Sequence, residues 1–370
     1  MGRRWAQAAA VGLGGLVTGA PAWACGAMVG PDGTVIAADA QRAAFDLRVA
    51  GTVTAHYEVR VQGDATRFGW LLPVFGEVQE VTDGEPGFFD ALEQRTAPRY
   101  DLLANNSPEP QGCACGPGSK ALSGDAANFG GDTGLTVVEQ GYAGPFAYAV
   151  LEATEAGALE AWLTDNGFVA GVAADTFAAY SADPRGVMWV AVRLAPAGAM
   201  SSDLVLPPLT IRWGAADDGT VAAVYPAVLA GTSTLPVLHT TLYVLGAGAG
   251  TVGAPWSVVP APENTQVIAG SSSDDAPAAV WEQHLTEVGA GGLQLFPTWS
   301  GQYEASGWLT RFDAIHAPAA LTADISLAAD GGQRWLETLI TIPAPDTGAA
   351  GLLGLPLGLG ALAWSRRRRR

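Results

Sequence analysis

The chain has 370 residues, with 36 Asp and Glu against 19 Lys and Arg and a formal net charge of −17. Seven of the basic residues are arginines at the two ends, so the part between Arg4 and Arg366 is more acidic still. Binding nucleic acid requires a basic surface, so this composition argues against a nucleic-acid partner. The 48 Gly and 24 Pro, with only 15% charged residues, predict many turns and strands rather than long helices.

The first 24 residues are organised like a signal peptide. Arg3 and Arg4 form a positive region, residues 8–20 are apolar, and Ala22-Trp23-Ala24 fits the small-residue pattern of a cleavage site. We therefore expect the mature chain to begin at Cys25. A lipid-modified Cys25 and an uncleaved N-terminal anchor are the alternatives.

Residues 343–370 are organised like a membrane anchor. A Pro-rich hinge leads into an uncharged run, 349–364, and five arginines follow at 366–370. A membrane helix needs roughly 20 apolar residues, with a lower limit of about 17, and this run lies near that limit. Because positive flanks stay in the cytoplasm, we expect a single span with the arginines inside and the body outside the cytoplasmic membrane.

The hinge resembles a sortase-type sorting signal, which reads Leu-Pro-x-Thr-Gly. Pro345, Asp346, Thr347 and Gly348 match this pattern, whereas Ala344 stands in place of the leucine. Two fates of the tail stay open. A retained span anchors the chain by itself, whereas cleavage between Thr347 and Gly348 requires a sortase-like processing enzyme as a partner.

The chain has three cysteines, Cys25, Cys113 and Cys115. Outside the cytoplasm a disulfide is the expected use, and the residues favour a bridge from Cys25 to Cys113 or to Cys115, with one thiol left over. A Cys113–Cys115 bridge is the strained alternative. A metal site at these cysteines has no obvious further ligands, because the four histidines are scattered singly along the chain.

Near the start of the body, residues 53–61 alternate between apolar and polar side chains. This alternation predicts a half-buried strand with one face formed by Val53, Ala55, Tyr57, Val59 and Val61. A turn signal and a second apolar run at 68–74 predict that the two strands form a hairpin.

A short helix is expected next. It starts near Pro86 and has an apolar stripe of Phe88, Phe89 and Leu92. Residues 104–134 are then rich in Gly, Asn and Ser, and a loop of this length is usually functional or disordered.

The rest of the body alternates between strands and helices. Helices are predicted at 155–166 and 175–181, the first with Leu159, Trp162 and Leu163 on one face. Strands are predicted at 136–138, 146–151, 187–194, 204–213, 221–229, 237–245, 308–315 and 321–327.

These elements favour an α+β fold, a mainly antiparallel β-sheet with a few short helices, followed by one C-terminal membrane-spanning helix. We expect a signal peptide at 1–24, a body at 25–342 and the tail at 343–370. Whether the body divides into two lobes, 25–134 and 135–342, is left open.

Several stretches of the sequence, taken together and in order, show a resemblance to a known family. They are Ala24-Cys25-Gly26, VTAHYEVRVQGDATRFGWLLPV at 53–74, FFDALEQRTAPRY at 88–100, VLEATEAGALEAWLTDNGF at 150–168, and WLTRFDAIHAPAALTADISL at 308–327. In this order they resemble the exported bacterial proteins grouped as domain of unknown function 2330. The resemblance implies an extracytoplasmic protein and carries no activity with it.

Catalytic motifs of the common kinds are absent from the sequence, including G-x-S-x-G, H-E-x-x-H and the phosphate-binding loop. We therefore predict no catalytic, cofactor-binding or metal-binding residues, and favour a cell-envelope protein with a binding or structural role. The alternatives are a hydrolase of envelope polymers and a thiol-redox protein that uses Cys113 and Cys115. Trp281, Trp299 and Trp308 are candidates for a carbohydrate platform, against the simpler reading that they pack in a core.

Overall fold

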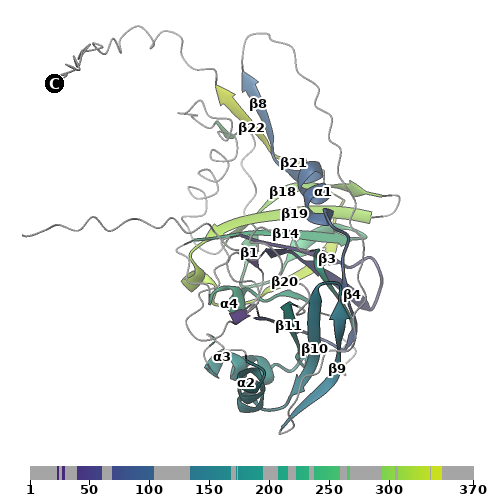
Figure 1. Ribbon diagram of the computed structural model, residues 1–370. Coiled ribbons are helices and arrows are strands. Elements are labelled where there is room, and N and C mark those ends of the chain that lie inside the picture. Colours follow the sequence, from purple (N-terminus) through teal and green to yellow (C-terminus); the bar gives the residue numbers. More distant parts are fainter. Residues whose placement is uncertain are drawn as a thin grey trace, which may run out of the picture.

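The computed structural model describes residues 23–24, 27–29, 40–60, 69–103, 134–167, 172, 174–194, 207–215, 222–232, 237–258, 265–266, 294–304, 307–333 and 335–343. Within these residues the body is built on two large sheets (Figure 1). The larger has nine strands, in the order β16 (Ser257–Val258), β18 (Gln294–Tyr303), β19 (Gly307–His316), β14 (Leu238–Gly246), β3 (Ala40–Asp46), β4 (Thr52–Tyr57), β12 (Leu209–Gly214) and β7 (Val78–Asp83), with β21 (Leu336–Glu337) beside β18. The second sheet has five strands, in the order β2 (Ala27–Val29), β6 (Gly69–Val74), β11 (Met188–Leu194), β10 (Phe146–Ala153) and β9 (Leu135–Ala143).

Most neighbouring strands are antiparallel, and the parallel pairs in the larger sheet are β14 with β3 and β16 with β18. The mainly antiparallel sheet with a few short helices is therefore confirmed. Strands that precede residue 104 and strands that follow residue 133 lie side by side in both sheets, because β6 pairs with β11 and β4 pairs with β12.

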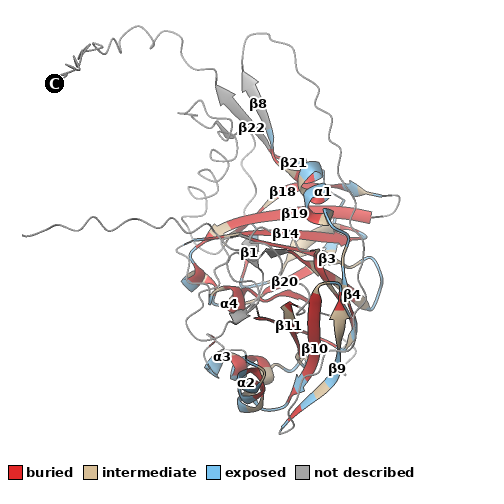
Figure 2. Cartoon of the chain, viewed as in Figure 1, coloured by how far each residue is buried: buried red, intermediate tan, exposed pale blue. Residues whose placement is uncertain are grey.

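The main core lies between the two sheets. Alternate residues of each strand point into it, as period-two geometry requires. Val53, Ala55 and Tyr57 of β4 are buried there, together with Trp70 and Leu72 of β6. The inward face predicted for Val53, Ala55 and Tyr57 is thus confirmed, but the strand predicted at 53–61 ends at Tyr57, and Val59 belongs to a separate two-residue strand, β5 (Val59–Arg60). Figure 2 shows other strands around this core, such as β10, β14 and β19, largely in red.

Two helices cover the other face of the five-stranded sheet. They are α2 (Ala156–Asp165) and α3 (Ala174–Ser181). Leu159, Trp162 and Leu163 of α2 are buried against this face, as predicted from their spacing. Gly167 ends the segment with φ 79°, a backbone conformation that glycine adopts without steric cost.

The helix α1 (Phe88–Thr96) covers part of the outer face of the nine-stranded sheet (Figure 1). Its buried residues Phe89 and Leu92 lie on the predicted stripe and pack with Tyr243 and Leu309 of the sheet. The larger sheet is therefore buried on both faces where α1 lies.

Smaller elements complete the described fold. They are the pair β1 (Trp23–Ala24) and β5 (Val59–Arg60), the sheet of β13 (Ala223–Tyr225), β20 (Ile325–Gly331) and β15 (Ala249–Val252), the sheet of β17 (Thr265–Gln266), β22 (Leu339–Pro343) and β8 (Arg99–Leu103), the helix α4 (Ala227–Ala230) and the 3₁₀ turn η3 (Pro318–Ala320).

The predicted hairpin between residues 53–61 and 68–74 is wrong. The strand β4 pairs with β3 and β12, whereas β6 pairs with β2 and β11 in the other sheet. All six residues of β6 are buried. A continuous apolar run suits a strand that is covered on both faces, and β6 is such a strand.

Several predicted strands begin or end at different residues, and two of them differ for a reason that the structure shows. The strand predicted at 221–229 stops at Tyr225, because Pro226 lacks an amide hydrogen and α4 follows it. The strand predicted at 321–327 begins only at Ile325, and Asp324 just before it accepts a hydrogen bond from the Val228 amide (3.0 Å).

None of the helices in the described part of the chain is long and apolar enough to cross a membrane. The predicted span at 349–364 lies outside the described residues and stays a prediction.

Candidate functional site

Charged side chains lie on the face of the nine-stranded sheet that α1 covers. Phe312 and Ala314 of β19 point into the main core, so Arg311 and Asp313 point the opposite way, toward α1. The Arg311 side chain is 3% exposed and that of Asp313 is completely buried. Burying charges is costly unless each one is paired and hydrogen-bonded, so the partners of these two residues decide what the site can do.

Asp313 is surrounded by hydrogen-bond donors. Arg311 donates from Nε (2.8 Å) and from Nη2 (3.0 Å), Thr241 Oγ1 donates at 2.9 Å and Thr298 Oγ1 at 2.7 Å. Burial alone would raise the pKa of Asp313, but the Arg311 charge and the hydrogen bonds outweigh it and hold that pKa below its ordinary value. His239 Nε2 lies 3.8 Å from Asp313 Oδ1, too far for a hydrogen bond.

Arg311 also connects the sheet to α1. Its Nη1 lies 3.0 Å from Glu93 Oε2 on the helix, and the Tyr243 hydroxyl donates to the same carboxylate oxygen at 3.1 Å. Burial opposes the charge on Arg311, but Asp313, Tyr243 and Glu93 together raise its pKa above the ordinary value. Arg311 therefore remains a cation, held between a sheet carboxylate and a helix carboxylate.

A second arginine makes a similar connection from β3. Arg42 donates from Nε to Glu58 Oε2 at 2.6 Å and from Nη2 to Glu58 Oε1, which makes a bidentate pair. Its Nη2 also lies 3.3 Å from Asp90 Oδ1 on α1, and its guanidinium carbon lies 5.5 Å from the centre of the Phe89 ring. We call Arg42, Glu58, Glu93, Arg311 and Asp313 the buried charge cluster.

The cluster is a network in which every charge has a partner of opposite sign. Each arginine faces carboxylates, and the shifts in the pKa of Arg311 and Asp313 both favour the charged forms. Neither residue is poised to exchange a proton near neutral pH, which a general acid or base must do. The arrangement holds α1 on the sheet.

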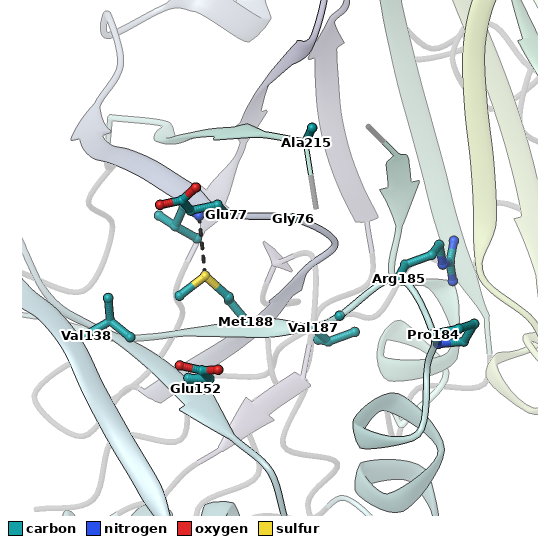
Figure 3. A pocket seen from close by; sticks show the side chains of 11 residues that line it. Gly76, Glu77, Val138, Glu152, Pro184, Arg185, Val187, Met188 and Ala215 are labelled. Atoms are coloured by element: carbon teal, nitrogen blue, oxygen red, sulfur yellow. Dashed lines mark hydrogen bonds between the residues drawn. The ribbon is translucent and has the colours of Figure 1, made fainter. Parts of the chain in front are cut away.

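A separate hollow of about 430 Å³ opens beside β7, β10 and β11 (Figure 3). Glu77 and Glu152 lie on either side of Met188 in this view, and the Val78 amide lies 3.4 Å from the Met188 sulfur. At another part of the rim, Arg185 is held by Asp183 (2.6 Å) and lies 4.2 Å from the centre of the Phe75 ring.

The lining of this hollow offers few groups that could take part in catalysis. Its carboxylates, Glu77 and Glu152, are exposed to solvent, and its lining contains no Ser, Thr, Cys or His. Over the described ranges, the structure has no group of three or more His, Cys, Asp or Glu side chains that could hold a metal ion.

Residues 19–328 match the bacterial family described as "Uncharacterized protein conserved in bacteria (DUF2330)". The chain belongs to DUF2330. No curated protein matches its sequence.

Three solved structures of baculovirus P35 align with this DUF2330 chain. Two are of a mutated P35 after caspase cleavage, at 8% and 10% identity and TM-scores of 0.34 and 0.29, and cover 80% and 81% of this chain and 99% of theirs. The third, of baculovirus P35 itself, has 8% identity and a TM-score of 0.32, and covers 82% of this chain and 96% of that one. TM-scores this low carry neither fold nor function over to the DUF2330 chain.

Most residues singled out from the sequence lie outside the described part of the DUF2330 chain. These are Cys25, Cys113 and Cys115, the sorting-like residues Pro345, Asp346, Thr347 and Gly348, and Trp281. Their disulfide pairing and processing stay predictions. Trp299 and Trp308 are described, and both are buried in the β18–β19 hairpin.

Sequence reasoning missed the buried charge cluster. A signal was present in residues 308–315, because Arg311 and Asp313 occupy every second position on the face opposite Trp308, Thr310 and Phe312. Two opposite charges on one face of a strand, flanked by Leu309 and Ile315, suggest a buried ion pair. The sequence does not reveal that Arg42 and Glu93 lie on the same face.

Proposed function

We propose that this DUF2330 chain is an exported cell-envelope protein that acts as a non-catalytic binding or structural ectodomain. In this proposal residues 25–342 lie outside the cytoplasmic membrane, and a single segment at 349–364 anchors them. The leader at 1–24 and the five arginines at 366–370 support the orientation, because positive flanks stay in the cytoplasm.

The state of the buried charges is the observation that carries the non-catalytic role. A catalytic acid or base needs a pKa near the working pH. The pKa of Asp313 is instead held low by Arg311, and the cluster is closed over by α1. The lining of the exposed hollow contains no Ser, Thr or Cys that could act as a nucleophile.

Export would also place the cysteines in an oxidising environment, where Cys25 pairs with Cys113 or Cys115. This pairing would attach the start of the mature chain to the 104–134 segment. The tail is either retained or cut at Thr347–Gly348, and intact mass distinguishes the two.

Cell fractionation tests the topology. Cells would express the full chain, a variant that lacks residues 349–370, and a control in which the five terminal arginines are replaced by serine. We expect the full chain in the membrane fraction, without residues 1–24 and open to protease added from outside, and the truncated chain released from membranes. The serine control should keep the apolar run but lose its fixed orientation.

Two results contradict the proposal. One is the truncated chain remaining in membranes, which would mean that the tail is not the anchor. The other is the full chain in the cytosol with its leader still attached.

A further inference from the structure

Aromatic rings gather at the end of the β18–β19 hairpin. The Trp335 ring, beside β21, lies 5.2 Å from the Trp308 ring between centroids, at an interplanar angle of 67°. Gly301 of β18 leaves the room for this arrangement, because a Cβ there would lie 2.6 Å from Trp335 Cζ3 and 2.9 Å from Trp299 Cη2. With Tyr303, the residues Trp299, Trp308 and Trp335 form what we call the aromatic patch.

Trp335 is unusual in its exposure. Its relative exposure is 67%, whereas all the other tryptophans with described side chains are buried. Folding normally removes much of so large a side chain from water, and tryptophan is among the residues that contribute most to binding at interfaces. The indole contacts the Trp308 ring and leaves most of its own surface open to solvent.

Polar groups frame this surface. Arg95 of α1 lies over the Trp299 ring (5.8 Å) and the Tyr303 ring (5.3 Å), and it donates to the Gln302 carbonyl at 2.8 Å. These contacts hold the Arg95 guanidinium beside the patch.

Two ion pairs also flank the patch. Arg99 Nε lies 2.6 Å from Glu337 Oε1, two residues along from Trp335, and Arg48 Nη1 lies 2.6 Å from Glu304 Oε2 at the hairpin turn. A partner therefore meets both hydrogen-bond donors and hydrogen-bond acceptors at the edge of the patch. A flat aromatic surface with both kinds of group at its edge suits a ligand that has an apolar face and many hydroxyls.

We propose that the aromatic patch binds a neutral oligosaccharide. A pyranose ring has a face of C–H bonds, which matches the exposed indole of Trp335, and a rim of hydroxyls, which both donate and accept hydrogen bonds. In this arrangement the sugar stacks on Trp335, and its hydroxyls bond to Arg99 and Glu337. This inference deepens the proposed binding role and rests on it, since envelope display brings the patch among glycans.

Saturation-transfer NMR on the purified full chain tests the inference, with cellohexaose, chitohexaose, maltohexaose and laminarihexaose as probes in a detergent without sugar groups. We expect at least one hexasaccharide to receive saturation, and Trp335→Ala to weaken its binding by about tenfold or more. Trp335→Phe keeps an aromatic face and should retain most of the binding. Gly301→Ala should weaken binding without removing the indole, because its Cβ displaces Trp335.

Val138→Ala is the matched control, because Val138 is also an exposed apolar residue (51%) but lies on β9 in the other sheet. It should leave binding unchanged.

Absence of transfer to all four sugars, or equal binding by Trp335→Ala, overturns the inference. Self-association of the full chain that Trp335→Ala abolishes, with no sugar bound, also overturns it and identifies a second copy as the partner. These measurements do not depend on where the protein resides, so their failure leaves the topology proposal standing, and the reverse also holds.

Discussion

Single buried polar residues set how stability depends on pH. His316, at the end of β19, is 8% exposed, and its Nε2 lies 3.0 Å from Thr240 Oγ1. Its Nδ1 has no hydrogen-bond partner among the described residues. Burial, with a smaller contribution from the nearby His239, lowers the pKa of His316 from 6.5 to about 4. A charge on this imidazole is therefore disfavoured in the folded state.

Stability should fall as the pH drops from 6.5 toward 4. In this window the unfolded chain binds a proton at His316 and the folded chain does not, so acid favours unfolding by roughly 3 kcal/mol once the pH is below both pKa values. Between pH 7 and pH 4.5, the free energy of unfolding in urea should fall less for His316→Gln than for the wild type. Equal losses in the two proteins, or an imidazole that titrates near 6.5 by NMR, would rule out this account.

At the scale of elements, the attachment of α1 to the sheet depends on charges contributed by separate strands. Arg311 and Asp313 come from β19, Arg42 from β3, and Glu93 and Asp90 from the helix. Burying each charge is tolerated only because its partners are present. Removing one member should therefore lower the free energy of unfolding more than removing both members of a pair.

Asp313→Asn should destabilise the fold by about 3 kcal/mol or more, because it leaves the buried Arg311 without its closest counter-charge. The double variant Arg311→Met with Asp313→Asn should recover much of this loss, since the unpaired cation is gone. Glu80→Gln is the matched control, because the Glu80–Arg212 pair (2.9 Å) is about half exposed and should change stability by under about 1 kcal/mol. Urea unfolding curves of the three variants and the wild type give these differences in the free energy of unfolding. An Asp313→Asn protein as stable as the wild type would mean that the cluster does not hold α1.

At the scale of the whole molecule, strands from before residue 104 pair with strands from after residue 133, and this pairing should make unfolding cooperative. The first segment supplies β3, β4 and β6, and the later part supplies their partners β14, β12 and β11. Neither segment completes a sheet without the other, so separating them would expose strand edges and the core between the sheets.

We therefore expect the body to unfold in a single transition. Far-UV circular dichroism reports the sheets and tryptophan fluorescence reports the core, and their midpoints in urea should coincide. A variant with a protease site inserted between residues 104 and 134 should keep the two fragments associated after cleavage. Two separated transitions, or fragments that come apart without denaturant, would instead support a body of two lobes.

The sequence by itself determined the local features of this protein. Alternation identified the buried side of residues 53–57, spacing identified the faces of α1 and α2, and the run of shared stretches identified the family. These features are readable because period-two and period-3.6 patterns arise within one element.

Only the tertiary structure decided the pairing of β4 and β6, the meeting of Arg42, Arg311 and Glu93, and the exposure of Trp335. Each of these depends on contacts between residues far apart in the chain. Which apolar run becomes a central strand, and which charge finds a counter-charge, depends on the elements packed against it, and no local pattern specifies those neighbours.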